Sequence, residues 1–223
     1  MKRVGRYAVS GMIERQYEPG SRGKVPRNLI GIKSKREMGK IESRELLRTL
    51  RTLIDTIDQS HRFKAADLCA MHREWLGNIY EWAGTYRKVN LAKENFTFAA
   101  AHLIPRLMDE FERHCLAVYT PCRTVSGNDL IHALAAVHVE LLLIHPFREG
   151  NGRLARMLAS LMALQAGLPP LDFGGVKGGK KQEYFTAVQS GLDRNYEPME
   201  KIFGGVIERT LRLRDQRFDS SEL

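Results

Sequence analysis

The chain has 223 residues, of which 43% are hydrophobic, so it is long enough to bury a core as one domain. Its formal net charge of +9 suits polyanionic ligands such as ATP, or an acidic partner. The basic residues are spread from Lys2 to Arg217 without a nucleic-acid-binding motif, so a nucleic acid is not expected as the substrate.

Neither membrane insertion nor secretion is expected from the sequence. No run of 18 apolar residues is present, and residues 1–7 lack the apolar region of a signal peptide. The three cysteines, Cys69, Cys115 and Cys122, form no C-x-x-C pair and are predicted to be reduced thiols. We therefore predict a cytoplasmic protein that does not contact the membrane; the sequence leaves its oligomeric state open, a homo-oligomer included.

Residues 1–35 are rich in Gly, Pro, Arg and Lys, which predicts an N-terminal extension followed by one compact domain over residues 36–223. Within the extension, Ser10 lies four residues before Glu14, and no other glutamate of the chain has Ser or Thr at that distance. This spacing is common by chance, so alone it assigns no role to the pair.

Apolar residues recur at a spacing close to 3.6 over most of the chain, which predicts an all-α fold. The predicted helices cover residues 35–58, 65–80, 101–119, 128–144, a stretch from Asn151 to a stop at Gly167, 182–192 and 198–213. His72 lies on the apolar side of the second helix and is predicted to be a core or boundary histidine rather than a metal ligand.

Residues 82–98 interrupt the helical pattern. β-Branched and aromatic residues alternate there around a polar Lys-Glu-Asn tip at residues 93–95, which is typical of a two-stranded hairpin. An isolated hairpin is only marginally stable, so we expect this one to pack on the helices.

Residues 145–156, H-P-F-R-E-G-N-G-R-L-A-R, combine the features of an anion site. They lead into a predicted helix, and the first N–H groups of a helix lack intrahelical partners and carry partial positive charge. Gly150 and Gly152 would let an anion approach the backbone closely. Asn151 is a good N-cap residue and can also donate hydrogen bonds from its side chain.

The remaining polar residues of this stretch also suit a polyphosphate. Arg153 and Arg156 are three residues apart and therefore share a helix face. Glu149 supplies a hard oxygen ligand for Mg²⁺, and His145 can accept a proton near neutral pH. Residues 174–181 approach a P-loop pattern, but Lys181 replaces the hydroxyl residue that would bind Mg²⁺.

At every specified position the twelve residues match H-x-F-x-[D/E]-G-N-G-R-x-x-R, the signature of the Fic (filamentation induced by cAMP) family. The resemblance extends from about Asp67 to Phe203. It implies a Fic-type bundle of about seven to eight helices with a small β-hairpin flap. Family members mostly transfer AMP from ATP to a hydroxyl side chain of a target protein, so the resemblance implies ATP as co-substrate, Mg²⁺ as cofactor and a protein carrying a Ser, Thr or Tyr hydroxyl as partner.

The resemblance also assigns roles to single residues. His145 would deprotonate the target hydroxyl, and Glu149 would hold Mg²⁺. The ATP-binding residues would be Gly150, Asn151, Gly152, Arg153 and Arg156, with Tyr184 beside the adenine. Relatives that act as kinases place Lys at the position of Gly152, so glycine there favours AMP transfer.

Two further segments resemble family features. The hairpin resembles the flap, whose edge receives the main chain of a target by strand addition, and the docking residues would be Val89, Phe96, Thr97 and Phe98. Ser10 and Glu14 resemble the inhibitory motif [S/T]-x-x-x-E-[G/N] that one class carries before the core, with Arg15 at the position where Gly or Asn is usual. Glu14 would then pair with Arg156 and prevent productive binding of ATP.

Two alternatives to AMP transfer stay open on sequence grounds. The same site could remove AMP from a modified protein, with the inhibitory glutamate orienting a water molecule. The chain could instead be a non-catalytic binding module that uses its basic surface, although binding alone would not need a histidine at position 145.

Overall fold

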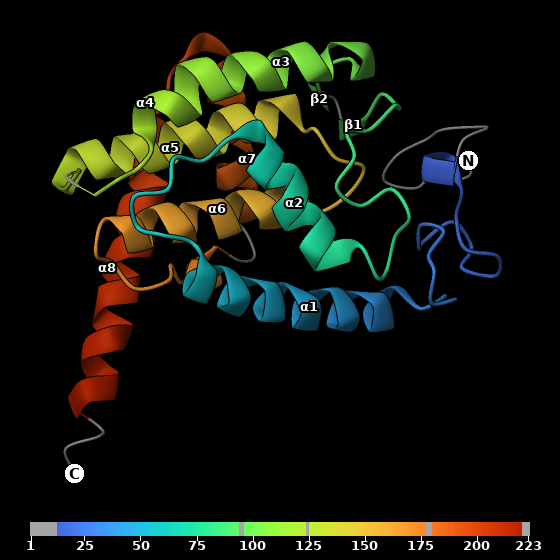
Figure 1. Ribbon diagram of the computed structural model, residues 1–223, viewed down its shortest axis with the longest axis horizontal. Helices are drawn as coiled ribbons and strands as arrows, with labels where there is room; N and C mark the ends of the chain where they lie inside the picture. Colours follow the sequence, from blue (N-terminus) through green and yellow to red (C-terminus); the bar gives the residue numbers. More distant parts are fainter. Residues whose placement is uncertain (1–12, 94–95, 124, 177–179, 220–223) are drawn as a thin grey trace. The chain divides into compact units, whose positions relative to one another are not determined.

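The computed structural model describes residues 13–93, 96–123, 125–176 and 180–219 (Figure 1). Ser10 lies outside these residues. The main helices are α1 (Lys35–Thr56), α2 (Ala65–Leu76), α3 (Ile104–Phe111), α4 (Ala117–Tyr119), α5 (Gly127–Ile144), α6 (Asn151–Gln165), α7 (Lys180–Ser190) and α8 (Glu197–Asp219). The predicted all-α fold with one small hairpin is confirmed.

The chain divides into two compact units. The first comprises residues 1–56, 64–110 and 144–154, and the second comprises residues 57–63, 111–143 and 155–223. Helix α6 begins in the first unit and continues into the second. The predicted division at residue 35 stays a prediction.

In the first unit, α1 packs on α2 (Figure 1). Helix α2 buries one continuous apolar face, which includes Leu68, Met71, Trp75 and Leu76. Its start is fixed by Asp67, whose carboxylate accepts a hydrogen bond from Lys64 N–H at 2.8 Å. The buried face of α1 is less apolar, because it includes the polar side chains of Glu42 and Thr49 together with Met38.

The segment before α1 is folded rather than a flexible tail from residue 16 onwards. Tyr17 and Pro26 form an isolated antiparallel bridge, and Glu18 N–H donates to Val25 O at 2.9 Å. Val25 is almost fully buried, and Leu29 N–H donates to Ile79 O at 2.9 Å. The glycines and prolines of this segment therefore form turns that hold it against the rest of the first unit.

The hairpin is much shorter than predicted. Strands β1 (Ala92–Lys93) and β2 (Phe96–Thr97) are antiparallel, with Ala92 opposite Thr97 and Lys93 opposite Phe96. Residues 82–90 form turns instead of a strand, because their polar groups bond within the core: Gly84 N–H donates to His72 Nδ1 and Arg87 N–H donates to Pro146 O, each at 2.8 Å. Buried and exposed residues alternate in this stretch because individual side chains enter the core, and not because the backbone forms a strand.

In the second unit, α5 is an apolar helix that is largely buried. It is the one helix in the described part of the chain that is long and apolar enough to cross a membrane, yet 61% of that length is buried within the protein, as in the core helix of a globular domain. The 3₁₀ turn η5 (Gly191–Asp193) approaches it so closely that a Cβ on Gly191 would lie 2.1 Å from Val139 Cγ1. Helices α7 and α8 also pack on one another.

Residues 101–119 are helical throughout, as predicted, but not uniformly. They begin with the 3₁₀ turn η2 (Ala101–Leu103), continue as α3, pass through the π-helical turn η3 (Glu112–Leu116) and end as α4. Pro121 follows two residues after the last residue of α4, where the sequence predicts the stop.

Candidate active site

The loop of residues 145–150 connects α5 to α6 and carries His145 in an unusual backbone conformation. Its φ is +53°, a left-handed conformation that non-glycine residues rarely adopt. The imidazole stacks on the ring of Phe98, with 3.8 Å between the ring centroids. The histidine is therefore fixed by its backbone on one side and by the hairpin on the other.

The buried side chain of Arg87 joins this loop to the base of the hairpin. Its Nε donates to His145 O at 2.7 Å, and one Nη donates to Ile144 O at 3.3 Å. The guanidinium also donates to Val89 O and to Ala99 O, each at 2.6 Å. One rigid cation thus holds four carbonyl groups that flank His145 and the hairpin, which explains why the strained conformation of His145 persists.

Asn151 closes the other end of the loop. Its side-chain oxygen accepts from Phe147 N–H at 2.9 Å, and its Nδ2 donates to Phe147 O at 2.7 Å. Both polar groups of this buried side chain are therefore used inside the protein. Asn151 shapes the loop, and its backbone N–H rather than its side chain is the group that it can offer to a phosphate.

His72 supports the loop from below. Its ring stacks on Phe147 at 4.0 Å, its Nδ1 accepts from Gly84 N–H, and its Nε2 lies 3.1 Å from Glu149 O. Because Nδ1 accepts, Nε2 must carry the proton that is donated to Glu149. Burial lowers the pKa of His72 to about 4, so the ring is neutral at physiological pH. The prediction of a core histidine is confirmed.

This buried histidine makes stability depend on pH. The pKa of His72 is about 4 in the folded chain and 6.5 when unperturbed, so the unfolded state binds a proton first as the pH falls. The contribution of neutral His72 to the free energy of unfolding is complete above pH 6.5. As the pH falls towards 4, this contribution is lost progressively, by roughly 3 kcal/mol in total. Urea unfolding measured between pH 4 and pH 6.5 should show this loss of stability. In His72→Gln, the slope of the unfolding free energy against pH should correspond to about one proton fewer. An unchanged slope in the variant would contradict this.

The N-terminus of α6 is held close to α2 by Gly150. The φ of Gly150 is +84°, and a Cβ at this position would lie 2.8 Å from the ring of Trp75. The carbonyl of Gly150 accepts from Arg153 N–H and Leu154 N–H at 3.0 and 2.9 Å. The N–H groups of Asn151 and Gly152 precede the first intrahelical bonds and are available for an anion.

Gly150 and Gly152 should respond differently to substitution. Gly150→Ala should destabilise the chain by roughly 1–3 kcal/mol, because the methyl group would meet Trp75 in a left-handed backbone. Gly152→Ala should be neutral or slightly stabilising, since a Cβ there has nothing within 4 Å and alanine favours helix. Thermal unfolding of the two variants tests this, and equal losses would contradict it.

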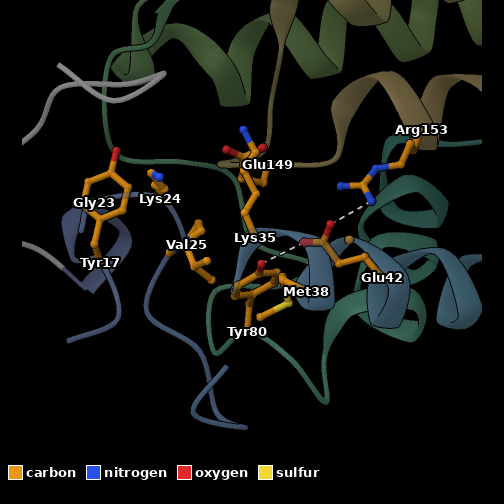
Figure 2. A pocket seen from close by; sticks show the side chains of 12 residues that line it. Tyr17, Gly23, Lys24, Val25, Lys35, Met38, Glu42, Tyr80, Glu149 and Arg153 are labelled. Carbon is orange, nitrogen blue, oxygen red and sulfur yellow. Dashed lines mark hydrogen bonds and ion pairs between the residues drawn. The ribbon is translucent and has the colours of Figure 1, made fainter. Parts of the chain in front are cut away.

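Arg153 is held by residues that the sequence analysis did not single out. Its Nη1 donates to Glu42 Oε2 at 2.8 Å, and its guanidinium lies 4.7 Å from the centre of the Trp75 ring. The other carboxylate oxygen of Glu42 accepts from Tyr80 OH at 2.8 Å, so both hydrogen bonds converge on Glu42 (Figure 2). The one sequence signal for the role of Glu42 is that a glutamate occupies the buried face of α1. Helical spacing alone does not distinguish Glu42 from the other glutamates of this helix.

Glu149 faces a pocket of about 250 Å³, together with Arg153 and Glu42 (Figure 2). Its side chain is 22% exposed. No group of three or more His, Cys, Asp or Glu side chains in the described ranges could form an all-protein metal site. A single accessible carboxylate suits Mg²⁺, which proteins often bind through one or two carboxylates while substrate phosphates complete the coordination.

Glu14 lies in the 3₁₀ turn η1 (Ile13–Arg15), against the loop and the hairpin base. The side chain of Glu14 is buried, and its Oε2 accepts from Lys88 N–H at 2.9 Å. Its backbone oxygen accepts from Nε of the buried Arg148 at 2.5 Å. Glu14 and Arg156 belong to different units, so the pairing of the two stays a prediction.

The predicted docking residues occupy the base and second strand of the hairpin. Val89, Leu91 and Phe98 form a buried cluster against which Phe96 packs. Thr97 is exposed on β2, whereas Val89 lies before the first strand. Phe98 N–H donates to Leu91 O at 3.1 Å, which extends the pairing by one bond beyond the strands.

In the second unit, Arg156 is surrounded by aromatic rings. Its guanidinium lies 5.2 Å from the centre of the Tyr184 ring and 5.6 Å from that of Phe173, at distances typical of cation–π contacts. The Tyr184 hydroxyl bonds His138 Nε2, and burial raises the pKa of Tyr184. The Nε of Arg156 is buried without a hydrogen-bond partner among the described residues.

Comparison with known proteins supports the resemblance of residues 145–156 to the Fic signature. The Fic/DOC family model matches residues 62–163. The chain is 32% identical over 147 residues to protein adenylyltransferase VbhT of Bartonella schoenbuchensis, covering 63% of this chain and 29% of that protein. It is 31% identical over 115 residues to protein adenylyltransferase fic-1 of Caenorhabditis briggsae, covering 51% and 22%. The chain is a Fic-domain protein.

Solved structures agree with this Fic fold. The N-terminal Fic domain of a putative cell filamentation protein from Bartonella quintana is 25% identical, with a TM-score of 0.67 over 85% of this chain and 92% of that one. The BepC protein of Bartonella tribocorum with bound AMPPNP is 22% identical, with a TM-score of 0.70 over 88% and 98%. The chain spans only 29% and 22% of the two curated relatives above.

Proposed function

We propose that this Fic domain transfers AMP from ATP to a Ser, Thr or Tyr hydroxyl of a target protein. The observation that carries the proposal is the complete signature folded as one loop and one helix start. His145 is held by Arg87 and Phe98 at one end of the loop, and the N–H groups of α6 open at the other. The adenylyltransferase relatives are consistent with this activity.

The proposed step is an in-line displacement at the α-phosphorus. The target hydroxyl oxygen attacks this phosphorus, and the bond to the oxygen that bridges the α- and β-phosphates breaks. The hydroxyl proton passes to His145, AMP becomes attached to the target, and pyrophosphate leaves. Proton transfer of this kind is typically worth about 10²–10⁴-fold in rate, and positioning of the reactants supplies much of the remainder.

The remaining signature residues would bind and orient the nucleotide. The backbone N–H groups at the start of α6, with Gly150 and Gly152, would hold the phosphates. Arg153 would meet the β-phosphate and Arg156 the γ-phosphate. Mg²⁺ held by Glu149 would neutralise charge on the leaving phosphates. Tyr184 would contact the adenine.

The hairpin would bind the target. A main chain added to the short edge of β1 or β2 would bring a hydroxyl towards His145, because Phe98 follows β2 directly and stacks on that histidine. Main-chain pairing demands little of the target sequence, so the substrate class is an extended, hydroxyl-bearing segment of a protein.

We also propose that Glu14 restrains the reaction. Its turn is bound to Arg148 of the signature loop and to Lys88 at the hairpin base, so it is anchored beside the site. Pairing of its carboxylate with Arg156 would then remove the cation that the γ-phosphate needs. Removal of AMP at the same site is the alternative activity, and Glu14 would there orient the attacking water.

Transfer of labelled nucleotide tests the proposal. The chain is incubated with α-labelled or γ-labelled ATP and Mg²⁺, and label bound to protein is counted for the native chain and for Glu14→Gly. Incorporation of the α label alone is the expected result. Incorporation of the γ label would indicate a kinase, and no incorporation of either label would favour the binding-module alternative.

A further inference from the structure

The pocket beside Glu149 is built mostly from residues outside the Fic signature. One wall comes from the N-terminal segment, with Tyr17, Lys24 and Val25, and another from α1, with Lys35 (Figure 2). Gly39 of α1 also lines the pocket. Glu149 and Arg153 are the signature residues that line it. All of its lining residues belong to the first unit.

The charges that line this pocket favour an anion once a cation is bound at Glu149. Three cationic side chains, Lys24, Lys35 and Arg153, face two carboxylates, Glu42 and Glu149. Glu42 already neutralises Arg153 at 2.8 Å. The two lysines form no ion pair within the described part of the chain, and a divalent ion would more than compensate Glu149. The uncompensated charge is therefore positive.

Two positions of α1 are occupied against local helix preference, and such departures are concentrated at functional sites. Lys35 is the first residue of α1, where the helix dipole disfavours a cation by about 0.3–1 kcal/mol. Gly39 lies within α1, where glycine costs about 1 kcal/mol relative to alanine, yet a Cβ there would have nothing within 4 Å. Packing does not demand glycine at this position, and the absence of a side chain leaves this wall of the pocket open.

We propose that this pocket binds pyrophosphate, the leaving group of the transfer reaction, with Lys24 and Lys35 as its phosphate-binding side chains. The inference rests on the proposed function, because it assumes that the leaving phosphates depart past Glu149 and Arg153. Glu42 assists release, since its carboxylate competes with the departing diphosphate for Arg153. The pocket thus gives pyrophosphate a site that the target hydroxyl does not share.

Calorimetric titration with magnesium pyrophosphate tests this without requiring any transfer activity. In Lys24→Gln/Lys35→Gln the Kd should rise roughly tenfold, as expected for two exposed charge contacts of about 0.7 kcal/mol each. Gly39→Leu, which fills the pocket and favours helix, should weaken binding similarly. The matched control Lys33→Gln/Lys40→Gln removes the same charge from exposed lysines outside the pocket and should stay within about twofold of the native chain.

Three results would overturn the inference: no binding to the native chain, equal weakening in both lysine pairs, or native affinity in Lys24→Gln/Lys35→Gln. The labelled-ATP experiment separates this inference from the proposed function. If the chain binds pyrophosphate through these residues but transfers no AMP, the pocket inference holds and the proposed function fails. If the chain transfers AMP but the pocket variants bind pyrophosphate with native affinity, the proposed function holds and the pocket inference fails.

Discussion

Replacement of His145 by asparagine is expected to reduce AMP transfer by about 10²–10⁴-fold, the usual contribution of a positioned general base. Asparagine tolerates the left-handed backbone found at this position, where φ is +53°, so the loop should keep its shape. The rate of incorporation of α-labelled AMP gives the measurement. Binding of ATP, followed by calorimetry, should change little because the imidazole acts on the hydroxyl rather than on the phosphates.

His145→Ala provides the second variant, and a substitution at His114, an exposed histidine of η3 outside the site, provides the control. His145→Ala should be as inactive as His145→Asn, while His114→Asn should transfer AMP at the native rate. Retention of more than about a tenth of the native rate in His145→Asn would remove the proton-accepting role from this residue.

Substitution of Glu14 is expected to change transfer in the opposite direction. Glu14→Gly should raise incorporation of the α label by roughly 10–100-fold, the range that corresponds to loss of one hydrogen bond between charged groups. The reason is that Arg156 would become available to the γ-phosphate. Initial rates at a fixed ATP concentration give the measurement.

The hydrogen bond from Lys88 N–H to Glu14 offers a second explanation that a matched variant can separate. In Glu14→Gln the amide oxygen can still accept from Lys88 N–H, but the negative charge is gone. If Glu14 is a brake, Glu14→Gln should also raise transfer. If Glu14 only anchors the hairpin base, Glu14→Gln should behave like the native chain and Glu14→Gly should transfer more slowly.

The helices were predictable because each signal is local. Periodic apolar residues marked α1, α2 and α5, and Pro121 marked the end of α4. The chemistry of residues 145–156 was also readable, since the signature residues are contiguous. The start of α6 at Asn151 is where the sequence indicates it.

What could not be predicted depends on contacts between distant segments. Arg87 appeared as one more basic residue of a hairpin, yet it binds carbonyl groups at residues 144 and 145. Glu42 appeared as one acidic residue on the charged face of a core helix, yet it is buried and holds Arg153. The hairpin predicted within residues 82–98 is shorter than expected for the same reason, because tertiary hydrogen bonds replaced strand pairing over residues 82–90.

The role of Asn151 also required the structure. Its residue type suits both phosphate binding and loop closure, and only the two hydrogen bonds to Phe147 show that its side chain closes the loop. Charge and composition cannot distinguish these uses, because both need the same donor and acceptor groups.

Mass spectrometry of modified protein tests the central claim most directly. The Glu14→Gly chain is incubated with ATP and Mg²⁺ in a cell lysate, and peptides are searched for the mass of one added AMP. The proposed function predicts AMP on a Ser, Thr or Tyr hydroxyl, on a target or on the chain itself, and its loss when His145→Asn is combined with Glu14→Gly. AMP addition that persists in the double variant, or no addition with native His145, would contradict the account.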